Sequence, residues 1–410
     1  MHVLYLTTEF PWPAISGGRV RSLADLRLIA SLPEVLGVDL VCLEEEPTSS
    51  DDIRALASEL PKLAIFPPVF HPIHLKKHPA WLPLVAALRL VPGLPYLAGK
   101  WVSPRVARAL RRVVLGRVPD LVYIDHLGMA VYERRLRRWA PRARFVLGQH
   151  NVESDFFAQF AAKKSGLVRR LAGLETRQAR RFEIDVMRRV DAVVAISSSD
   201  AASFEEMAGV LASVVPQVVP VTRTPWEPRG PRAVYVGNLS WHPNVAGLDW
   251  FCERVWPLVR DALPSAELDV VGSGLPRGEG GEQIVPDRWK KPGITVHGFV
   301  ADLEPLYLRS SAFVAPILGG SGVRIKLLEG FRAGLPLVTT PAGALGLPIA
   351  SGREALVAGA PGDFARDLVR LLCDVELQRS LREGAYTFLE REHGLAAAQA
   401  VAREVLGLGP

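Results

Sequence analysis

The feature that most constrains the fold is an alternation of short apolar runs with amphipathic stretches, present in both halves of the chain. In the first half, residues 2–7 and 37–44 have the pattern of buried strands, and residues 17–32 carry apolar side chains near helical spacing. Strand, helix and strand in this order form a βαβ unit, so the alternation predicts a parallel, doubly wound sheet. Further strands of this sheet are predicted at residues 120–125, 144–151 and 191–197.

The second half repeats the alternation. Strands are predicted at residues 232–240, 266–274, 294–300, 312–317 and 335–340, with a helix over 245–263. Five prolines interrupt residues 216–231, which is typical of a join between domains. A chain of 410 residues is long enough for two domains. We predict an N-terminal domain over 1–220, a second over 221–385, and a last segment, 386–410, that packs back on the first.

Composition excludes several classes of protein. Apolar residues make up 49% and charged residues 22% of the chain, as in a soluble globular protein. No apolar run reaches the roughly 18 uncharged residues of a membrane span, and the opening MHVLYLTTEFPWP lacks the features of a signal peptide. We therefore expect a cytoplasmic protein. Cys42, Cys252 and Cys373 lie far apart in apolar stretches, which predicts buried thiols and not disulfides or zinc ligands.

Loops that follow strands are the candidates for chemistry, because ligands of open parallel sheets bind at the carboxyl ends of the strands. One such loop, GGSG at residues 319–322, precedes a helix that ends near Gly334. A glycine-rich turn at a helix N-terminus lets backbone N–H groups approach a phosphate, whose charge the helix dipole favours. Arg324 and Lys326 add two cations nearby, an arrangement that suits a diphosphate.

Glu329 lies three residues after Lys326, on roughly the same helical face. A carboxylate there could accept hydrogen bonds from both hydroxyls of a ribose, and an anion site beside a ribose site indicates a nucleotide. The alternative is a mobile loop followed by an ordinary surface pair of lysine and glutamate. Spacing alone leaves both interpretations open.

The second half resembles the C-terminal domain of glycosyltransferases of the large family 4 type in three stretches: GGSGVRIKLLEGFRAGLPLVTTPAGALGL (319–347), VYVGNLSWHPNVAGLDWF (234–251) and HGFVADLEPLY (297–307). The first half resembles the matching segments in TEFPWPAISGGRVR (8–21), LVYIDHLGMAVY (121–132) and LGQHNVES (147–154). The chain also resembles the exopolysaccharide-associated branch of this family. The resemblance covers nearly the whole chain and favours the ligand interpretation of the glycine-rich loop.

This resemblance implies the α/β fold called GT-B, in which two Rossmann-like doubly wound domains face each other across a cleft. It also implies an enzyme that takes a sugar from a nucleoside diphosphate donor and retains its anomeric configuration. Glu329 matches the glutamate that holds the donor ribose, and Arg324 and Lys326 match the segment around the departing diphosphate, where they would act in catalysis. The other expected donor-binding residues are Gly319, Gly320, Ser321, Gly322, Val323, Phe299, Val300, Gly237 and Asn238.

Departures from the family pattern leave some roles open. A first motif glutamate, eight positions before Glu329, is replaced by Ser321, so the transferred sugar is not identified. The Arg and Lys that many relatives carry after the first strand of this domain are missing from VGNLSWHPN. Phe299 either frames the base or is a core aromatic. His242 and Asn244 either contact the donor or cap the following helix, and a structural role is favoured for Asn244.

In the first half, His150 matches a family position close to the reacting carbon of the sugar, and the resemblance implies a catalytic role for it. Gly17 and Gly18 open the helix after the first strand and are expected to border the diphosphate and the acceptor, with a tight turn as the alternative. His126 is a weaker candidate on the acceptor side. Two carboxylates are alternatives for binding sugar hydroxyls, Asp125 and Glu153.

Retaining transfer without an evident enzymatic nucleophile suggests that the acceptor attacks on the face from which the diphosphate departs. The sequence contains no DxD motif that would place a metal ion between carboxylates. Arg324 and Lys326 would therefore neutralise the diphosphate in place of Mg²⁺. We expect no metal ion and no other cofactor.

The net charge of +6 is unevenly distributed, because the first 225 residues carry 30 lysines and arginines against 22 acidic residues. The arginines gather at residues 105–117, 134–144 and 169–189. Two interpretations fit this pattern: a peripheral contact with anionic lipid near a lipid-linked acceptor, or ordinary solvated helix faces.

Residues 80–99 are apolar but broken by prolines, so they would line an acceptor cleft or enter a membrane interface without spanning it. Nucleic-acid binding is not expected, since no recognition motif is present.

Two other functions remain as alternatives. A nucleotide-sugar epimerase on the same fold would form sugar products without an acceptor, and a non-catalytic nucleotide-sugar-binding protein would hold the donor without turning it over. A phosphorylase with pyridoxal phosphate is disfavoured, because Lys290, Lys291 and Lys326 are the only lysines of the C-terminal half and Lys326 is assigned to phosphate. The expected role is in cell-surface polysaccharide or glycolipid synthesis, and the base, the sugar and the acceptor are not identified by the sequence.

Overall fold

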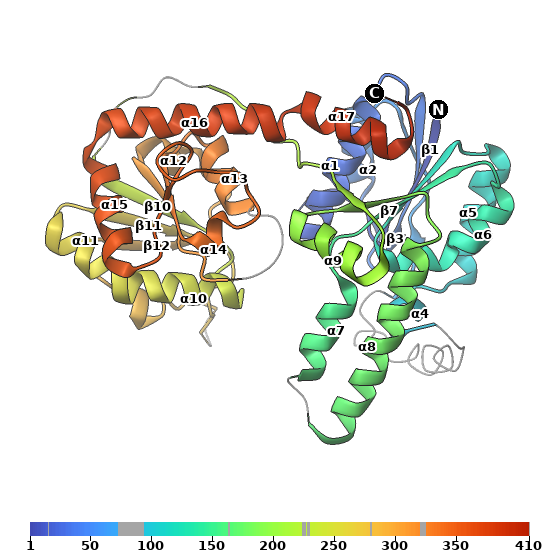
Figure 1. Cartoon of the computed structure of the whole chain (residues 1–410), viewed down its shortest axis with the longest axis horizontal. Coiled ribbons are helices and arrows are strands. Elements are labelled where there is room, and N and C mark those ends of the chain that lie inside the picture. The colour runs from blue at the N-terminus through green and yellow to red at the C-terminus, as the bar shows by residue number, and fades with distance from the viewer. Residues whose placement is uncertain are drawn as a thin grey trace. The chain divides into compact units, whose positions relative to one another are not determined.

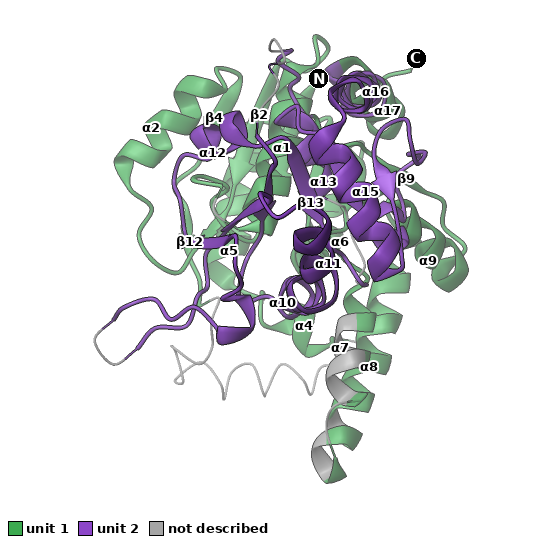
Figure 2. Ribbon diagram, turned by 90° about the vertical axis from the view of Figure 1, so that its left-hand side faces the viewer, with its two compact units in different colours: residues 1–218, 396–410 green, residues 219–395 purple. Residues whose placement is uncertain are grey.

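The computed structural model describes residues 1–14, 16–72, 94–162, 165–223, 227, 230–278, 281–319 and 325–409. They form two compact units, one of residues 1–218 with 396–410 and the other of residues 219–395 (Figure 2). The chain leaves unit 1 at Val218, inside the proline-rich stretch 216–231, and returns to it at Ala396.

Unit 1 is built on a seven-stranded parallel sheet (Figure 1). In pairing order its strands are β4 (Leu63–Ile65), β2 (Gly37–Val41), β1 (His2–Leu6), β6 (Leu121–Asp125), β7 (Arg144–Gly148), β8 (Ala192–Ala195) and β9 (Ala212–Val214). Because β1 pairs with β2 on one side and β6 on the other, the direction of the connections reverses between β1 and β6. Ligands of such sheets bind at the carboxyl ends of the strands beside this switch point.

Helices cover both faces of this sheet, which explains why the four consecutive residues Val3–Leu6 of β1 are all buried. Leu4 and Leu6 pack into one apolar cluster, and Val3 and Tyr5 into another. The helices in the described part of unit 1 are α1 (Gly17–Ser31), α2 (Ser50–Glu59), α4 (Tyr96–Gly99), α5 (Pro104–Gly116), α6 (Glu133–Trp139), α7 (Glu153–Ala162), α8 (Gly166–Met187), α9 (Ser198–Ala208) and α17 (Leu395–Leu406), with a 3₁₀ helix over Leu127–Tyr132. A separate parallel pair is formed by β3 (Leu43–Glu44) and β5 (Val69–Phe70).

Unit 2 has a six-stranded parallel sheet with the strand order of a dinucleotide-binding fold. In pairing order its strands are β12 (Ile294–Gly298), β11 (Glu267–Val271), β10 (Arg232–Val236), β13 (Ala312–Ala315), β14 (Leu337–Thr339) and β15 (Leu356–Val357). The switch point lies between β10 and β13, which pair directly. The loops after these two strands are therefore the expected ligand site of the unit.

The helices of unit 2 include one continuous rod made of α10 (His242–Trp250), a π-helical turn (Phe251–Val255) and α11 (Trp256–Ala262). The rod was predicted at 245–263, and it begins three residues earlier with a proline in its first turn. The remaining helices are α12 (Glu304–Arg309), α13 (Ile325–Arg332), α14 (Pro341–Ala344), α15 (Pro361–Cys373) and α16 (Val375–His393), with a 3₁₀ helix over Asp287–Trp289. Gly334 follows α13 with φ of 65°, as predicted for a residue that ends a helix.

The predicted fold class is confirmed, because both sheets are parallel and doubly wound. The prediction of three buried thiols is wrong for Cys373, which is exposed, whereas Cys42 and Cys252 are buried. Cys373 is the last residue of α15, and its neighbours Leu371 and Leu372 occupy the buried face of that helix. No helix in the described part of the chain is long and apolar enough to span a bilayer.

Candidate functional site

Lys326 lies at the switch point of unit 2. It is the second residue of α13, which follows β13, and its side chain reaches Tyr235 of β10 and Asn244 of α10. Its Nζ atom donates to the hydroxyl of Tyr235 at 3.0 Å and to Oδ1 of Asn244 at 3.2 Å, and it lies 4.2 Å from the centre of the Tyr235 ring. A cation is thus fixed by neutral groups where a sheet of this kind binds its ligand.

The electrostatic state of Lys326 follows from its surroundings. Burial lowers the pKa of Lys326 to about 7, because an ammonium ion is less stable away from water. Within the described residues no carboxylate forms an ion pair with it. A bound anion would supply the missing opposite charge and restore the charged form.

The loop after β10 is shaped around this lysine. A Cβ atom on Gly237 would lie only 2.9 Å from Lys326 Nζ, so the glycine leaves room for the ammonium group. The backbone carbonyl of Asn238 accepts from Asn244 Nδ2 at 3.0 Å, and its side-chain Oδ1 accepts from Ser240 N at 2.8 Å. Asn244 is the third residue of α10 and does not cap it; its side chain has a structural role of another kind, since it bridges the loop and Lys326.

Glu329 lies one turn after Lys326 on α13 and is held by two neighbours. Its Oε1 accepts from the Tyr307 hydroxyl at 2.9 Å and from Arg332 Nη2 at 2.7 Å. Burial by itself raises the pKa of Glu329, but the hydrogen bonds and the charge of Arg332 outweigh it and hold the pKa below its ordinary value. Glu329 is therefore a fixed, ionised acceptor in the partly buried site.

Some of the remaining donor-side residues lie within the described part of the chain and others do not. Gly319 is described and has open space around its Cβ position. Phe299 is 67% exposed after β12, so it is not a core aromatic, whereas Val300 packs against the apolar core. His242 is exposed at the start of α10. Five predicted site residues lie outside the described residues: Gly320, Ser321, Gly322, Val323 and Arg324.

In unit 1, the centre of the site is a pair formed by Asp125 and His150. Asp125 is the last residue of β6 and His150 follows β7, and Asp125 Oδ1 lies 2.6 Å from His150 Nε2. The other carboxylate oxygen accepts from Thr7 Oγ1 at 2.8 Å and Ser22 Oγ at 2.5 Å. Asp125 is thus fully buried and hydrogen-bonded through both oxygens.

Asp125 and His150 shift each other's pKa toward the charged forms. Burial by itself raises the pKa of Asp125, but His150 and the hydrogen bonds bring it well below its ordinary value. Burial by itself lowers the pKa of His150, but the carboxylate outweighs it and raises that pKa above its ordinary value. The carboxylate therefore orients the imidazole and favours its charged form.

His126 adjoins this pair, with its ring centre 3.7 Å from that of His150. Its φ of 78° is the only positive value of a non-glycine residue in the described chain, and its N–H donates to Gly148 O at 2.9 Å. A residue in this strained region is more frequent at functional sites than elsewhere. Burial and the nearby charge of His150 lower the pKa of His126 to about 3, so it is neutral.

Gly17 and Gly18 are the first two residues of α1, capped by Ser16, whose Oγ accepts from Arg19 N at 3.2 Å. They begin a helix and do not form a tight turn. A Cβ on Gly18 would lie 3.8 Å from His126 Nε2, which places this glycine beside His126.

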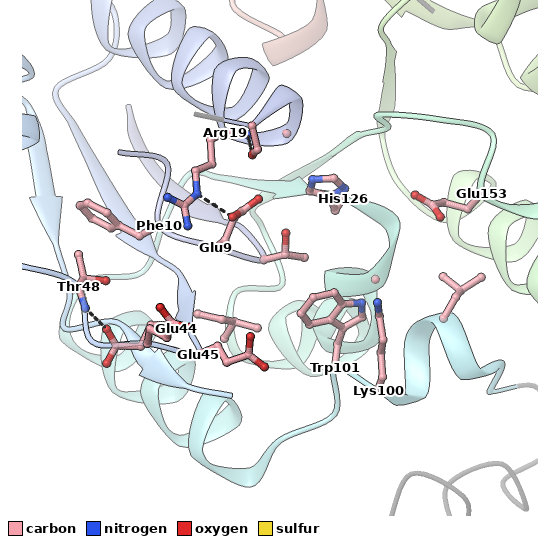
Figure 3. A pocket seen from close by; sticks show the side chains of 17 residues that line it. Glu9, Phe10, Arg19, Glu44, Glu45, Thr48, Lys100, Trp101, His126 and Glu153 are labelled. Atoms are coloured by element: carbon pink, nitrogen blue, oxygen red, sulfur yellow. Dashed lines mark hydrogen bonds and ion pairs between the residues drawn. The ribbon is translucent and has the colours of Figure 1, made fainter. Parts of the chain in front are cut away.

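Gly18 and His126 border a cavity of about 690 Å³ whose lining residues all belong to unit 1. His126, Gly18 and Glu153 line it, together with residues that follow β1 and β3 and residues of α4 (Figure 3). Glu153, at the start of α7, has its pKa raised by burial, partly offset by Lys100 and His150. A volume of this size is typical of a small-molecule site.

Several residues of unit 1 that position the site were not predicted. Glu183 of α8 is fully buried and accepts from Gln149 Nε2 at 3.2 Å and Glu153 N at 3.0 Å, which anchors the loop carrying His150; burial raises its pKa to about 7. Arg21 and Asp25 form a buried ion pair at 3.0 Å on α1. The sequence feature that could have identified Arg21 and Asp25 is their charge, because both lie in the stretch 17–32, whose apolar residues predict a buried helix face.

Asp125, His126 and His150 are also a group that could hold a metal ion, since their ligand atoms lie within 4.8 Å of one another. Asp125 Oδ1 and His150 Nε2 bond directly to each other, however, and Asp125 Oδ2 is taken up by two hydroxyls. Both carboxylate oxygens of Asp125 and the Nε2 atom of His150 are therefore already paired. The arrangement fits an oriented imidazole better than a metal centre, and the absence of a metal stays a prediction.

Two family models match the chain, one for most of each unit. Residues 52–223 match a model described as Glycosyltransferase Family 4, and residues 230–374 match one described as Glycosyl transferases group 1. An uncharacterised 44.6 kDa protein from the cps region of Klebsiella pneumoniae is 20% identical over 407 residues, which cover 95% of this chain and 96% of that protein.

Solved structures share the fold over the whole chain. Anabaena HepE in complex with UDP and glucose has a TM-score of 0.61 at 15% identity and covers 100% of both chains. The apo form of WaaB, a lipopolysaccharide outer core galactosyltransferase, has a TM-score of 0.61 at 13% identity, covering 100% of this chain and 99% of that one. Together with the two family models, this fold places the chain among the glycosyltransferases with the GT-B fold.

Proposed function

We propose that this glycosyltransferase moves a sugar from a nucleoside diphosphate sugar to an acceptor hydroxyl, with retention of configuration, in the synthesis of a cell-surface polysaccharide or glycolipid. The observation that carries the proposal is Lys326. Its ammonium group is fixed at the switch point of unit 2, and within the described residues it bonds only to neutral partners. A diphosphate is the ligand that supplies opposite charge at this position.

The donor would bind along α13. Lys326 faces the diphosphate, and Glu329, held by Tyr307 and Arg332, accepts from the ribose hydroxyls. Arg324 adds a second cation next to the phosphates, as the family resemblance implies. HepE has been solved with UDP and with UDP-glucose, which supports a uridine nucleotide as the first donor to test.

In the transfer step, the bond between the anomeric carbon and the diphosphate oxygen breaks, and the acceptor oxygen bonds to the same face of that carbon. The acceptor proton passes to the departing phosphate oxygen. Lys326 and Arg324 stabilise the negative charge that accumulates on the diphosphate, which requires no metal ion. Removal of one such fixed donor costs about 10²–10³ in kcat in related chemistry.

His150 would act on the sugar. Its Nε2 is bound to Asp125, so Nδ1 and the ring edge are the parts that can face a ligand. Asp125 fixes the orientation of the ring and favours its charged form. The likeness in fold to a lipopolysaccharide galactosyltransferase supports the cell-surface role.

The proposal is tested by turnover of nucleotide sugars. The purified chain is incubated with UDP-, GDP-, ADP- and dTDP-sugars, with and without neutral glycosides and polyprenyl diphosphate sugars, and nucleoside diphosphate release and sugar products are measured. We expect acceptor-dependent release that Lys326→Ala reduces at least a hundredfold and Lys290→Ala, a change at an exposed lysine, leaves intact. An isomerised sugar formed without acceptor would instead indicate an epimerase, and binding without turnover a non-catalytic protein.

A further inference from the structure

A buried carboxylate of α8 holds the segment that carries two functional side chains of unit 1. This segment, residues 149–154, follows β7 and includes the first two residues of α7. It bears His150, which is bonded to Asp125, and Glu153, which lines the cavity (Figure 3). Glu183 lies on α8, which packs against α7 (Figure 1), and its side chain is fully buried.

Three donors of the segment converge on Glu183. Its Oε1 accepts from Gln149 Nε2 at 3.2 Å and from Glu153 N at 3.0 Å, and its Oε2 accepts from Ser154 N at 3.2 Å. Gln149 directly precedes His150, whereas the two backbone donors begin α7. One carboxylate therefore fixes the chain on both sides of His150.

Glu183 also acts as a cap for α7 that comes from another helix. The first N–H groups of a helix have no partner within it, and the helix dipole favours a negative charge beside them. The side chain of Gln149 depends on the same acceptor. Among the described residues its Oε1 has no hydrogen-bond partner, so the bond from Nε2 to Glu183 is the polar contact that orients this amide.

This arrangement requires a carboxylate and not an amide at position 183. Both oxygens of an ionised glutamate accept hydrogen bonds, whereas a glutamine has one accepting oxygen and a donating NH₂ group. Whichever way such an amide is turned, its NH₂ group faces the N–H of either Glu153 or Ser154. A buried donor that faces another donor loses its hydrogen bond, which loosens the start of α7.

We propose that Glu183 is a positioning residue that fixes His150 and Glu153 as one unit, so that the imidazole stays aligned with Asp125 while the carboxylate of Glu153 stays in the cavity. This inference rests on the proposed function and adds a residue on which both side chains depend. Glu183 is not among the described residues that line the cavity. Its effect on turnover therefore passes through the segment 149–154.

The test compares Glu183→Gln with Glu133→Gln. Glu133 is a matched control, because it is equally buried in unit 1 but pairs with Arg137 and Arg189 and not with the segment. Measurements are made at pH 8, since burial raises the pKa of Glu183 to about 7 and the ionised carboxylate is the form that accepts from all three donors. Thermal unfolding shows that both variants are folded.

Two readouts report on the segment and do not require turnover. NMR of the chain with ¹⁵N-labelled histidine follows the His150 Nε2–H that donates to Asp125, and amide hydrogen exchange follows the N–H groups of Glu153 and Ser154. In Glu183→Gln we expect the His150 signal to broaden or disappear and the two amides to exchange at least tenfold faster. The control variant should leave both readouts unchanged.

Turnover separates positioning from donor binding. With a nucleotide sugar and acceptor that support the reaction, Glu183→Gln should lower kcat at least tenfold, because a misplaced functional group slows the chemical step. It should change the KM for the donor less than twofold, since the proposed donor residues belong to unit 2. Glu133→Gln should change kcat and KM less than twofold.

A second variant, Gln149→Met, keeps the inference testable if Glu183→Gln does not fold. It keeps the carboxylate and the length of the side chain but removes the donor next to His150. We expect it to disturb the His150 signal and to leave the exchange of the Glu153 amide unchanged, because that N–H still donates to Glu183.

An unchanged His150 signal in Glu183→Gln, or in Gln149→Met if the first variant does not fold, would overturn the inference. Equal effects of Glu183→Gln and Glu133→Gln, or a raised donor KM at unchanged kcat, would also overturn it. Saturation-transfer NMR with nucleotide sugars is measured on the same samples and reports on unit 2. If no nucleotide sugar binds or turns over, the proposed function fails, and the two readouts on the segment still decide whether Glu183 positions His150.

Discussion

At the scale of single residues, the candidate site depends on charged groups whose surroundings set their protonation. Lys326 is hydrogen-bonded to a phenol and an amide, and burial lowers its pKa to about 7. A bound anion would favour the protonated, charged form of this lysine. The spacing of Lys326 and Glu329 on one helical face could be predicted from the sequence. The partners Tyr235 and Asn244 could not, because they come from a strand and a helix far earlier in the chain.

The titration of Lys326 makes donor binding depend on pH. In the free protein the ammonium form is lost as the pH rises through about 7, whereas a bound diphosphate favours that form. Donor binding above pH 7 therefore takes up a proton, and the Kd for the donor rises with pH by up to about tenfold per unit. Calorimetry with UDP-glucose at pH 6.5 and 8.5, in buffers of different ionisation enthalpy, measures both effects. An affinity that is the same at both pH values, or a dependence that Lys326→Met retains, would contradict this assignment.

The Asp125–His150 pair gives a second prediction. The carboxylate raises the pKa of His150 against the opposing effect of burial, so Asp125→Asn should bring that pKa below its ordinary value. An NMR titration of the histidine ring protons, assigned with His150→Gln, follows the change. Asp155→Asn, at an exposed position, is the control. A pKa of His150 that stays high in Asp125→Asn would show that another group charges the ring.

At the scale of elements, the site residues lie where helices begin after strands. A shift of a few residues in where a helix begins therefore changes the role of the side chains there. The helix was predicted to begin at residue 245, but α10 begins at His242 with Pro243 in its first turn, so Asn244 faces Lys326 from within the helix. Capping patterns locate a helix end only within a few residues. A burial pattern likewise failed at Cys373, because the last residue of a helix can turn away from the core.

Close packing of α10 against the end of β13 supplies a test at this scale. A Cβ on Gly247 would lie 1.9 Å from the carbonyl oxygen of Pro316, so Gly247→Ala must shift α10 and with it Asn244. We expect a loss of about 1–3 kcal/mol in stability and weaker donor binding, although Gly247 itself is not assigned to the ligand. Gly362→Ala, where the Cβ has open space in α15, is the control. Thermal unfolding and donor titration measure the two effects, and equal behaviour of both variants would contradict the packing argument.

At the scale of the whole molecule, the alternation of strands and helices was enough to predict two parallel doubly wound sheets, since central strands such as β1, β6 and β13 are buried on both faces. Leu4 and Val3 of β1 enter different cores, a pattern that only a sheet covered on both sides produces. The identity of sugar and acceptor could not be predicted in the same way. These depend on side chains brought together from distant loops, such as Glu45, Trp101 and Glu153 around the cavity of unit 1.

The expected absence of a metal is a prediction about the complete enzyme. If Lys326 and Arg324 neutralise the diphosphate, turnover should be unchanged in excess EDTA and should not increase with added Mg²⁺. Nucleoside diphosphate release from the donor, measured before and after chelation, decides this. Activity that is lost in EDTA and restored by Mg²⁺ would show that the two cations do not suffice.

The central claim, that Lys326 and Glu329 hold a nucleotide sugar, is tested most directly by saturation-transfer NMR with a panel of nucleotide sugars. The account predicts transfer to the nucleotide in the unmodified chain, its loss in Lys326→Ala and in Glu329→Ala, and its retention in Lys290→Ala. Unchanged donor binding in both Lys326→Ala and Glu329→Ala would contradict it.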